Sequence, residues 1–200
     1  LEDKTIRFTE IVPEELEQGS FLDVRVDPDT HPQQPWGFCL ATPDGTKHRC
    51  LVMANLLPGR LHMDDSRVIY LVPDIKAAWK LIADIADECQ SPVYYWSKNI
   101  LGHINKTACK EARHRLIARI VDLSGIFLTI AAVPTKKDGL HDIATYLGYN
   151  PWGRDHEPYK AHIAYLGWLN DNQRIDLLNK AIDYLDNNVD AVAYVYQWLK

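Results

Sequence analysis

The chain has 200 residues, of which 46% are hydrophobic, and its formal net charge is −5. This length and apolar content are sufficient for one packed core, so we expect a single globular domain over residues 1–200. The acidic balance argues against a protein that coats nucleic acid or binds membranes through a polybasic surface, although an enzyme with one local basic groove is still compatible with it.

The first part of the chain predicts strands. Residues 1–20 combine several glutamates with breakers, and we expect a lead-in strand or a short helix there. The next segment, FLDVRVDP at residues 21–28, alternates apolar and charged side chains, which is typical of a strand with two unlike faces. Its apolar residues are Leu22, Val24 and Val26, and its charged residues are Asp23, Arg25 and Asp27. The turn sequence at residues 43–45, PDG, predicts a hairpin, so the chain opens with a meander.

The middle of the chain alternates helix and strand. Asp74 opens a predicted helix whose apolar residues recur at three- and four-residue steps through Ala86. The sequence SPVYYWS at residues 91–97 predicts a buried strand. A second amphipathic helix is expected over residues 111–123, with these residues facing inward: Leu116, Ile117, Ile120 and Val121.

The last third is expected to be mostly helical. The run FLTIAAV at residues 127–133 predicts either a strand or a helical turn, and LHDIATYLGY predicts a short helix that ends at Gly148. Asp171 is expected to cap the longest helix, whose apolar period continues to the C-terminus. This order of elements predicts an α/β fold, a three-layer domain with a mixed sheet in which the meander is extended by a parallel strand.

The cysteine pattern bears on the compartment. The four cysteines form no CxxC motif, so the sequence indicates neither a zinc ribbon nor a disulfide framework. The sequence contains no apolar run of about 18 residues and no signal peptide, and we expect a cytoplasmic protein that does not enter a membrane. The chain begins at Leu1 without Met, which suggests a fragment excised from a longer protein.

Five segments together resemble a known family. They are FLDVRVDP, VYYWSKNILGHI, RIVDLSGIF, GLHDIATYLGYNPW and AIDYLDNNVDAVAYVYQWL, and they span residues 21–199. Their order and spacing resemble the predicted RNase H-like 3′ to 5′ exonuclease domains found beside RecB-type nucleases and helicases, which are relatives of the DnaQ proofreading fold. The resemblance implies an RNase H-like, DnaQ-type fold with helices on both sides of the sheet.

The resemblance also implies a site. In that family the first strand carries Asp, an apolar residue and Glu, followed by Pro, and the two acids hold divalent metal ions. Asp23 and Pro28 match this motif, whereas Arg25 stands at the Glu position. In the motif of the last helix Asn187 and Asp190 match, and Asp186 replaces a Tyr.

A third motif of the family is a Tyr-rich strand end that leads into a helix with an acidic residue. The sequence YYW at residues 94–96 resembles that strand end, but Asn99 or Ile100 stands where the acid is expected. Two of the four expected carboxylates are therefore present.

The resemblance thus implies three sets of site residues. The catalytic residues would be Asp23 and Asp190. The ligands of Mg²⁺ or Mn²⁺ would be Asp23, Asp27 and Asp190. The contacts to nucleic acid would come from Arg25, Lys98 and Asn187.

Two classes of function are left open at this point. The first is a nucleic-acid-associated binding or scaffolding module that has lost catalysis and serves a larger nucleic-acid machine. The second is an active, metal-dependent 3′ to 5′ exonuclease on DNA or RNA ends. A basic groove near Arg25, Lys98, Lys106 and Lys110 without metal would favour the first class. Asp190 is also compatible with a plain acid on a helix surface. The Trp and Tyr side chains at residues 94–96, 152, 165, 168, 194, 196 and 198 could stack on bases, but at these apolar positions we expect core packing.

Overall fold

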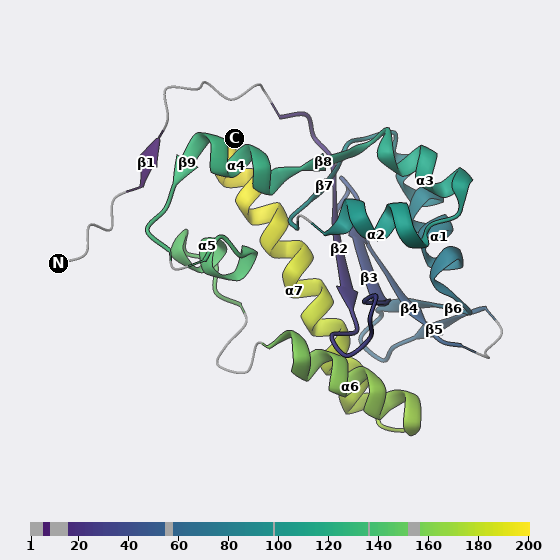
Figure 1. Ribbon diagram of the computed structural model, residues 1–200. Coiled ribbons are helices and arrows are strands. Elements are labelled where there is room, and N and C mark those ends of the chain that lie inside the picture. The colour runs from purple at the N-terminus through teal and green to yellow at the C-terminus, as the bar shows by residue number, and fades with distance from the viewer. Residues whose placement is uncertain (1–5, 9–15, 55–57, 98, 136, 152–156) are drawn as a thin grey trace.

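The computed structural model describes residues 6–8, 16–54, 58–97, 99–135, 137–151 and 157–200 (Figure 1). Within them a seven-stranded sheet has the order β5-β6-β4-β3-β2-β7-β8. The strands are β2 (Ser20–Val26), β3 (Pro35–Ala41), β4 (Lys47–Val52), β5 (Gly59–His62), β6 (Val68–Val72), β7 (Val93–Tyr95) and β8 (Ile120–Asp122). A separate pair joins β1 (Arg7–Phe8) to β9 (Ala131–Ala132).

The strand pairing changes from antiparallel to parallel at β2. On one side β2 pairs antiparallel with β3, and β3 pairs antiparallel with β4, which confirms the predicted meander. The β3–β4 turn contains Gly45 at a φ of 87°, a conformation that glycine adopts without strain. On the other side β2 pairs parallel with β7, and β7 pairs parallel with β8. Strand β6 adds to β4 in parallel, and β5 closes that edge antiparallel.

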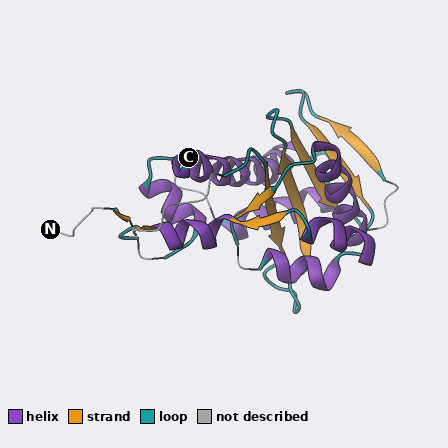
Figure 2. Cartoon of the chain, turned by 90° about the horizontal axis from the view of Figure 1, so that it is seen from above, coloured by secondary structure: helices purple, strands orange, loops and turns teal. Residues whose placement is uncertain are grey.

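Helices cover both faces of the sheet, as Figure 2 shows from above. One face packs on α1 (Ile75–Cys89), α2 (Ile100–Thr107) and α3 (Lys110–Ile117), and the other packs on α7 (Ile175–Leu199). The alternation of β2 explains the division, because Leu22 belongs to the apolar cluster under α1 and Phe21 to the cluster under α7. The remaining helices are α4 (Leu123–Ile130), α5 (Leu140–Tyr146) and α6 (Pro158–Asn170). The coarse prediction of a mixed α/β domain is confirmed.

Local signals predicted the start of α1 well. The carboxylate of Asp74 accepts a hydrogen bond of 2.8 Å from the backbone N–H of Ala77, which satisfies one of the free donors of the first turn. Trp79 and Ile82 are fully buried, as the three- and four-residue period predicted.

The helix predicted over residues 111–123 is confirmed in its first part, where Leu116 is buried, and is wrong after residue 117. Helix α3 ends at Ile117, which is 44% exposed and so does not face inward as predicted, and the chain then forms β8. Ile120 pairs with Val93 and Val121 pairs with Tyr94, so Ile120 and Val121 belong to the sheet and not to a helix. Short apolar runs fit a strand or a helix equally well, and here the free edge of β7 decides between them.

Two further boundaries differ from the prediction. Asp171 ends α6 and does not cap α7, which begins at Ile175 after Arg174. Of the run at residues 127–133, the first part is the end of α4 and only Ala131–Ala132 form a strand. In the described part of the chain, no helix combines the length and the apolar character needed to cross a bilayer.

Candidate functional site

A cleft of about 640 Å³ lies at the carboxyl ends of the parallel strands β2 and β7. We call it the β2–β7 cleft, and its lining includes Asp23, Arg25, Ser97, His141, Tyr184 and Asn188. In open α/β sheets, ligands bind beyond the carboxyl ends of strands where the strand order reverses. Here the order reverses at β2. The strands that follow β2 directly in the chain, β3 and β4, lie on one side of it, and the later strands β7 and β8 lie on its other side.

Asp23 and Arg25 form a two-point ion pair in this cleft. Arg25 Nη2 lies 2.5 Å from Asp23 Oδ1, and Arg25 Nε lies 2.6 Å from Oδ2. The two residues project from the same face of β2 because they are two positions apart. The Asp23 side chain is 6% exposed and that of Arg25 is 23% exposed. Both oxygens of the carboxylate are therefore occupied by one guanidinium.

Helix α7 completes the surroundings of Arg25. The guanidinium carbon lies 5.0 Å from the centre of the Tyr184 ring, and Nη1 donates to Tyr184 Oη at 3.4 Å. One turn later, the buried Asn188 donates from Nδ2 to the Tyr184 carbonyl at 2.6 Å. A guanidinium over an aromatic face is attracted by the ring quadrupole, so Tyr184 helps to hold Arg25 in its pair with Asp23.

Burial and charge act against each other in this pair. Burial raises the pKa of Asp23, and the charge and hydrogen bonds of Arg25 oppose that rise. For Arg25, burial lowers the pKa, but the charge and hydrogen bonding of Asp23 together with Tyr184 outweigh burial, and the pKa is raised overall. The guanidinium therefore stays charged at any pH at which the protein is folded.

The acids of α7 face a different set of partners. Asp183, Asp186 and Asp190 follow one stripe of the helix, and this stripe meets cations of the meander and of the turn before β6. Asp190 Oδ2 lies 2.6 Å from Lys47 Nζ. Asp186 receives two hydrogen bonds from Arg49, at 2.7 and 2.8 Å. The predicted partner of Asp23 is thus engaged on β4, two strands away from β2.

The other predicted site residues are dispersed. Asp27 accepts a hydrogen bond from the backbone N–H of Asp29 at 2.8 Å, and its Oδ1 lies 3.7 Å from Nδ1 of His162. Asn187 lines a separate hollow between α6 and α7. Lys98 lies outside the described residues. The structure therefore brings Asp23 and Arg25 together and distributes the rest.

These donors do not fit a pair of divalent ions. A two-metal site needs several carboxylates around ions about 4 Å apart. In the β2–β7 cleft the oxygens of Asp23 already accept from a cation, and Asp190 bonds Lys47. Among the described residues, no group of three or more His, Cys, Asp or Glu side chains is arranged to hold a metal ion.

Sequence reasoning missed Tyr184 and Asn188. Asn188 could have been found from the sequence, because it is a polar residue on the apolar face of α7. Its neighbours on that face are Leu185, Val189 and Val192. Asn187, which was chosen instead, is adjacent in sequence but is rotated by about 100° around a helix of 3.6 residues per turn. The packing of α7 on the sheet determines which of the two faces the cleft.

No protein-family model matches the chain, and a search of curated proteins finds no match either.

Proposed function

We propose that this chain is an RNase H-like, DnaQ-related domain that binds the end of a single nucleic-acid strand and does not cleave it. The strand order supports the fold assignment, because a meander of β2, β3 and β4 is continued beyond its first strand by the parallel strands β7 and β8. The location of the β2–β7 cleft supports the site for two reasons. The cleft contains Asp23, which matches the first motif of the family, and it lies where the strand order reverses.

The observation that carries the loss of catalysis is the Asp23–Arg25 pair. Each carboxylate oxygen lies within 2.5 to 2.6 Å of a guanidinium nitrogen. A divalent ion at Asp23 would have to displace this guanidinium and remain beside its positive charge. Metal-assisted hydrolysis needs ions that stabilise both the attacking water and the leaving oxygen, and this arrangement opposes the first of them.

The lining of the cleft favours a strand end over an internal phosphate. It carries Arg25 and Lys137 as cations and Asp23, Asp138 and Asp142 as carboxylates, together with the amide of Asn188. Carboxylates repel phosphates but accept hydrogen bonds from hydroxyl groups. A terminal nucleotide offers both a phosphate for the cations and free sugar hydroxyls for the acceptors.

The test compares a linear strand with a circular strand of equal length. We expect the linear strand to bind and the circular strand to bind weakly, in fluorescence anisotropy at low salt, because binding is salt-dependent. The variant Lys137→Gln should weaken binding of the linear strand, and the matched control Lys80→Gln, on the outer side of α1, should not. Equal binding of both strands, or none, would contradict the proposal.

Degradation is measured in parallel with Mg²⁺ or Mn²⁺ present. We expect the strand to stay intact over many hours. Metal-dependent degradation that is abolished by Asp23→Ala would instead establish the active exonuclease.

A further inference from the structure

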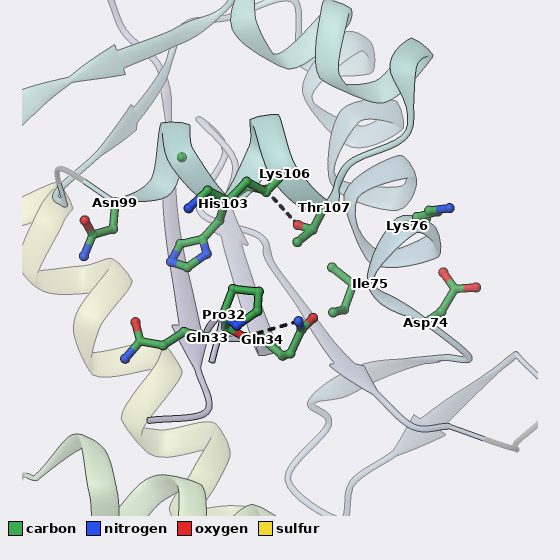
Figure 3. A pocket seen from close by; sticks show the side chains of 11 residues that line it. Pro32, Gln33, Gln34, Asp74, Ile75, Lys76, Asn99, His103, Lys106 and Thr107 are labelled. Atoms are coloured by element: carbon green, nitrogen blue, oxygen red, sulfur yellow. Dashed lines mark hydrogen bonds between the residues drawn. The ribbon is translucent and has the colours of Figure 1, made fainter. Parts of the chain in front are cut away.

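A second cleft lies on the opposite face of the sheet, under α1 and α2. It has a volume of about 720 Å³, within the range of small-molecule sites. We call it the α1–α2 cleft. Figure 3 shows that three segments surround it: the start of α1 with Ile75 and Lys76, one side of α2 with His103 and Lys106, and the turn after β2 with Gln33 and Gln34.

The charge of this cleft is opposite to that of the whole chain. Lys76 and Lys106 supply two cations, and Asp74 is the one carboxylate among the lining residues. The oxygen Oδ1 of Asp74 already caps α1 by accepting from Ala77. In a chain with a net charge of −5, this local cationic excess attracts anions.

The pKa of His103 is affected by that positive potential. Its side chain points from α2 toward Pro32 and Gln33 (Figure 3). Partial burial lowers its pKa, and the nearby Lys106 lowers it further. An anion bound between the two side chains would reverse the second effect, because it would favour the protonated imidazole.

Amide side chains give the cleft a second kind of recognition. Gln33, Gln34 and Asn99 line it, and the side chain of Asn99 makes no capping bond to α2. Carboxamides present a donor and an acceptor together and so match the edges of nucleobases. The floor is open at Gly102, where an added Cβ would meet no atom within 4 Å, so a ligand can approach the helix closely.

The two clefts are neighbours along the chain at two places. In the loop between β7 and α2, Ser97 lines the β2–β7 cleft and Asn99 lines the α1–α2 cleft. At the end of β2, Arg25 lines the first cleft, and the following turn with Pro32 lines the second. Strand β2 with the turn that follows it and the loop between β7 and α2 therefore each contribute to both clefts.

We propose that the α1–α2 cleft binds a nucleotide of the same single strand whose end occupies the β2–β7 cleft. Lys106 and His103 contact its phosphate, and the amides of Gln33 and Asn99 contact the base edge. This inference rests on the proposed function. It adds a second phosphate-binding position, in a cleft whose lining has one carboxylate where that of the β2–β7 cleft has three.

The test uses the full chain and a single strand of about eight nucleotides, which is within the usual site size of single-strand binders. The variant Lys106→Gln should weaken binding about fivefold near physiological salt and reduce the salt slope by about 0.7, as expected for one lost phosphate contact on a single strand. Lys80→Gln removes the same charge from α1 outside the cleft and should leave both quantities unchanged. Unchanged circular dichroism would show that the variants fold.

The outcomes separate this inference from the proposed function. If Lys106→Gln binds like Lys80→Gln while Lys137→Gln weakens binding, the α1–α2 cleft is not used and the inference is overturned, but the strand-end site stands. If all three variants bind the strand like the natural chain, both proposals fail.

A direct measurement of the cleft is available from the Gly102 amide in the isotope-labelled chain. Adenosine monophosphate should shift this NMR signal at concentrations where inorganic phosphate does not. An equal response to both ligands would show that the cleft binds phosphate without the base, and it would overturn the assignment to a nucleotide.

Discussion

Arg25 lies with its guanidinium carbon 5.0 Å from the centre of the Tyr184 ring, although the two residues are 159 positions apart. This contact joins β2 to α7 at the β2–β7 cleft and holds the cation that neutralises Asp23. The contact links the stability of the fold to the chemistry of the site.

We expect Arg25→Ala to destabilise the protein strongly, because it leaves the buried Asp23 carboxylate without its partner. Breaking a buried pair in this way costs about 3 to 5 kcal/mol of the free energy of unfolding. Urea denaturation measures the loss. The double variant Asp23→Leu with Arg25→Leu should lose much less, because no buried charge is left, and a double variant as unstable as Arg25→Ala would contradict this account.

Arg25→Glu should make the protein respond to metal. It replaces the cation by a carboxylate next to Asp23, and a divalent ion is then needed to neutralise the pair. We expect Mn²⁺ to raise the midpoint of thermal unfolding of this variant and to leave that of the natural chain unchanged. Arg25→Gln has a similar shape without the charge and should show no response to Mn²⁺.

Adding a further acid should strengthen that response only at a suitable position. Asn99→Asp should not strengthen the response of Arg25→Glu to Mn²⁺, because Asn99 lines the α1–α2 cleft and not the β2–β7 cleft that contains Asp23. Ile100→Glu is not suitable, because Ile100 is 2% exposed and packs in the apolar cluster under α1. That variant should instead lose stability, whether or not metal is present.

The pair of Arg49 and Asp186 should contribute to the docking of α7. Their side chains are only 11% and 14% exposed, and two hydrogen bonds join them. Arg49→Ala should cost about 3 kcal/mol of unfolding free energy, because a poorly hydrated carboxylate is left behind. Arg174→Ala is the matched control, since its pair with Asp176 is 54% exposed on both sides, and it should leave stability unchanged within error.

Trp79 should be among the most sensitive core residues. It is fully buried, its ring meets Phe38 edge to face at 4.8 Å, and its Nε1 donates to Thr107 Oγ1 at 2.8 Å. Trp79→Ala should reduce the free energy of unfolding by about 3 to 5 kcal/mol. A loss below about 1 kcal/mol would mean that α1 is not packed on this face of the sheet.

Binding of a nucleotide at the α1–α2 cleft should depend on the protonation of His103. Because burial and Lys106 lower its pKa, the imidazole is neutral near pH 7 and gains a proton as the pH falls. The added positive charge strengthens phosphate binding, so affinity for a single strand should rise between about pH 7 and pH 5.

The variant His103→Gln is the control for this pH dependence. The difference between the pH profiles of the natural chain and of this variant isolates the contribution of His103. The profile of His103→Gln should be flatter than that of the natural chain. Identical profiles would show that His103 does not contact the bound anion.

Local periodicity determined a large part of this fold. The alternation in β2 and the turn at Gly45 were readable because the backbone fixes them over a few residues, as was the Asp74 cap of α1. For the same reason the opposition of Asp23 and Arg25 to the apolar face was predictable.

Tertiary packing decided what local patterns left open. Residues 120–122 became a strand because the edge of β7 was free to pair with them. The rotation of α7 on the sheet turned Tyr184 and Asn188 toward the cleft and Asp190 toward Lys47. Successive helix positions differ by about 100°, so a small rotation of α7 would turn different amides and acids toward the sheet. The sequence contains these residues, and only the packing of α7 against β2, β3 and β4 determines which of them line the cleft that contains Asp23.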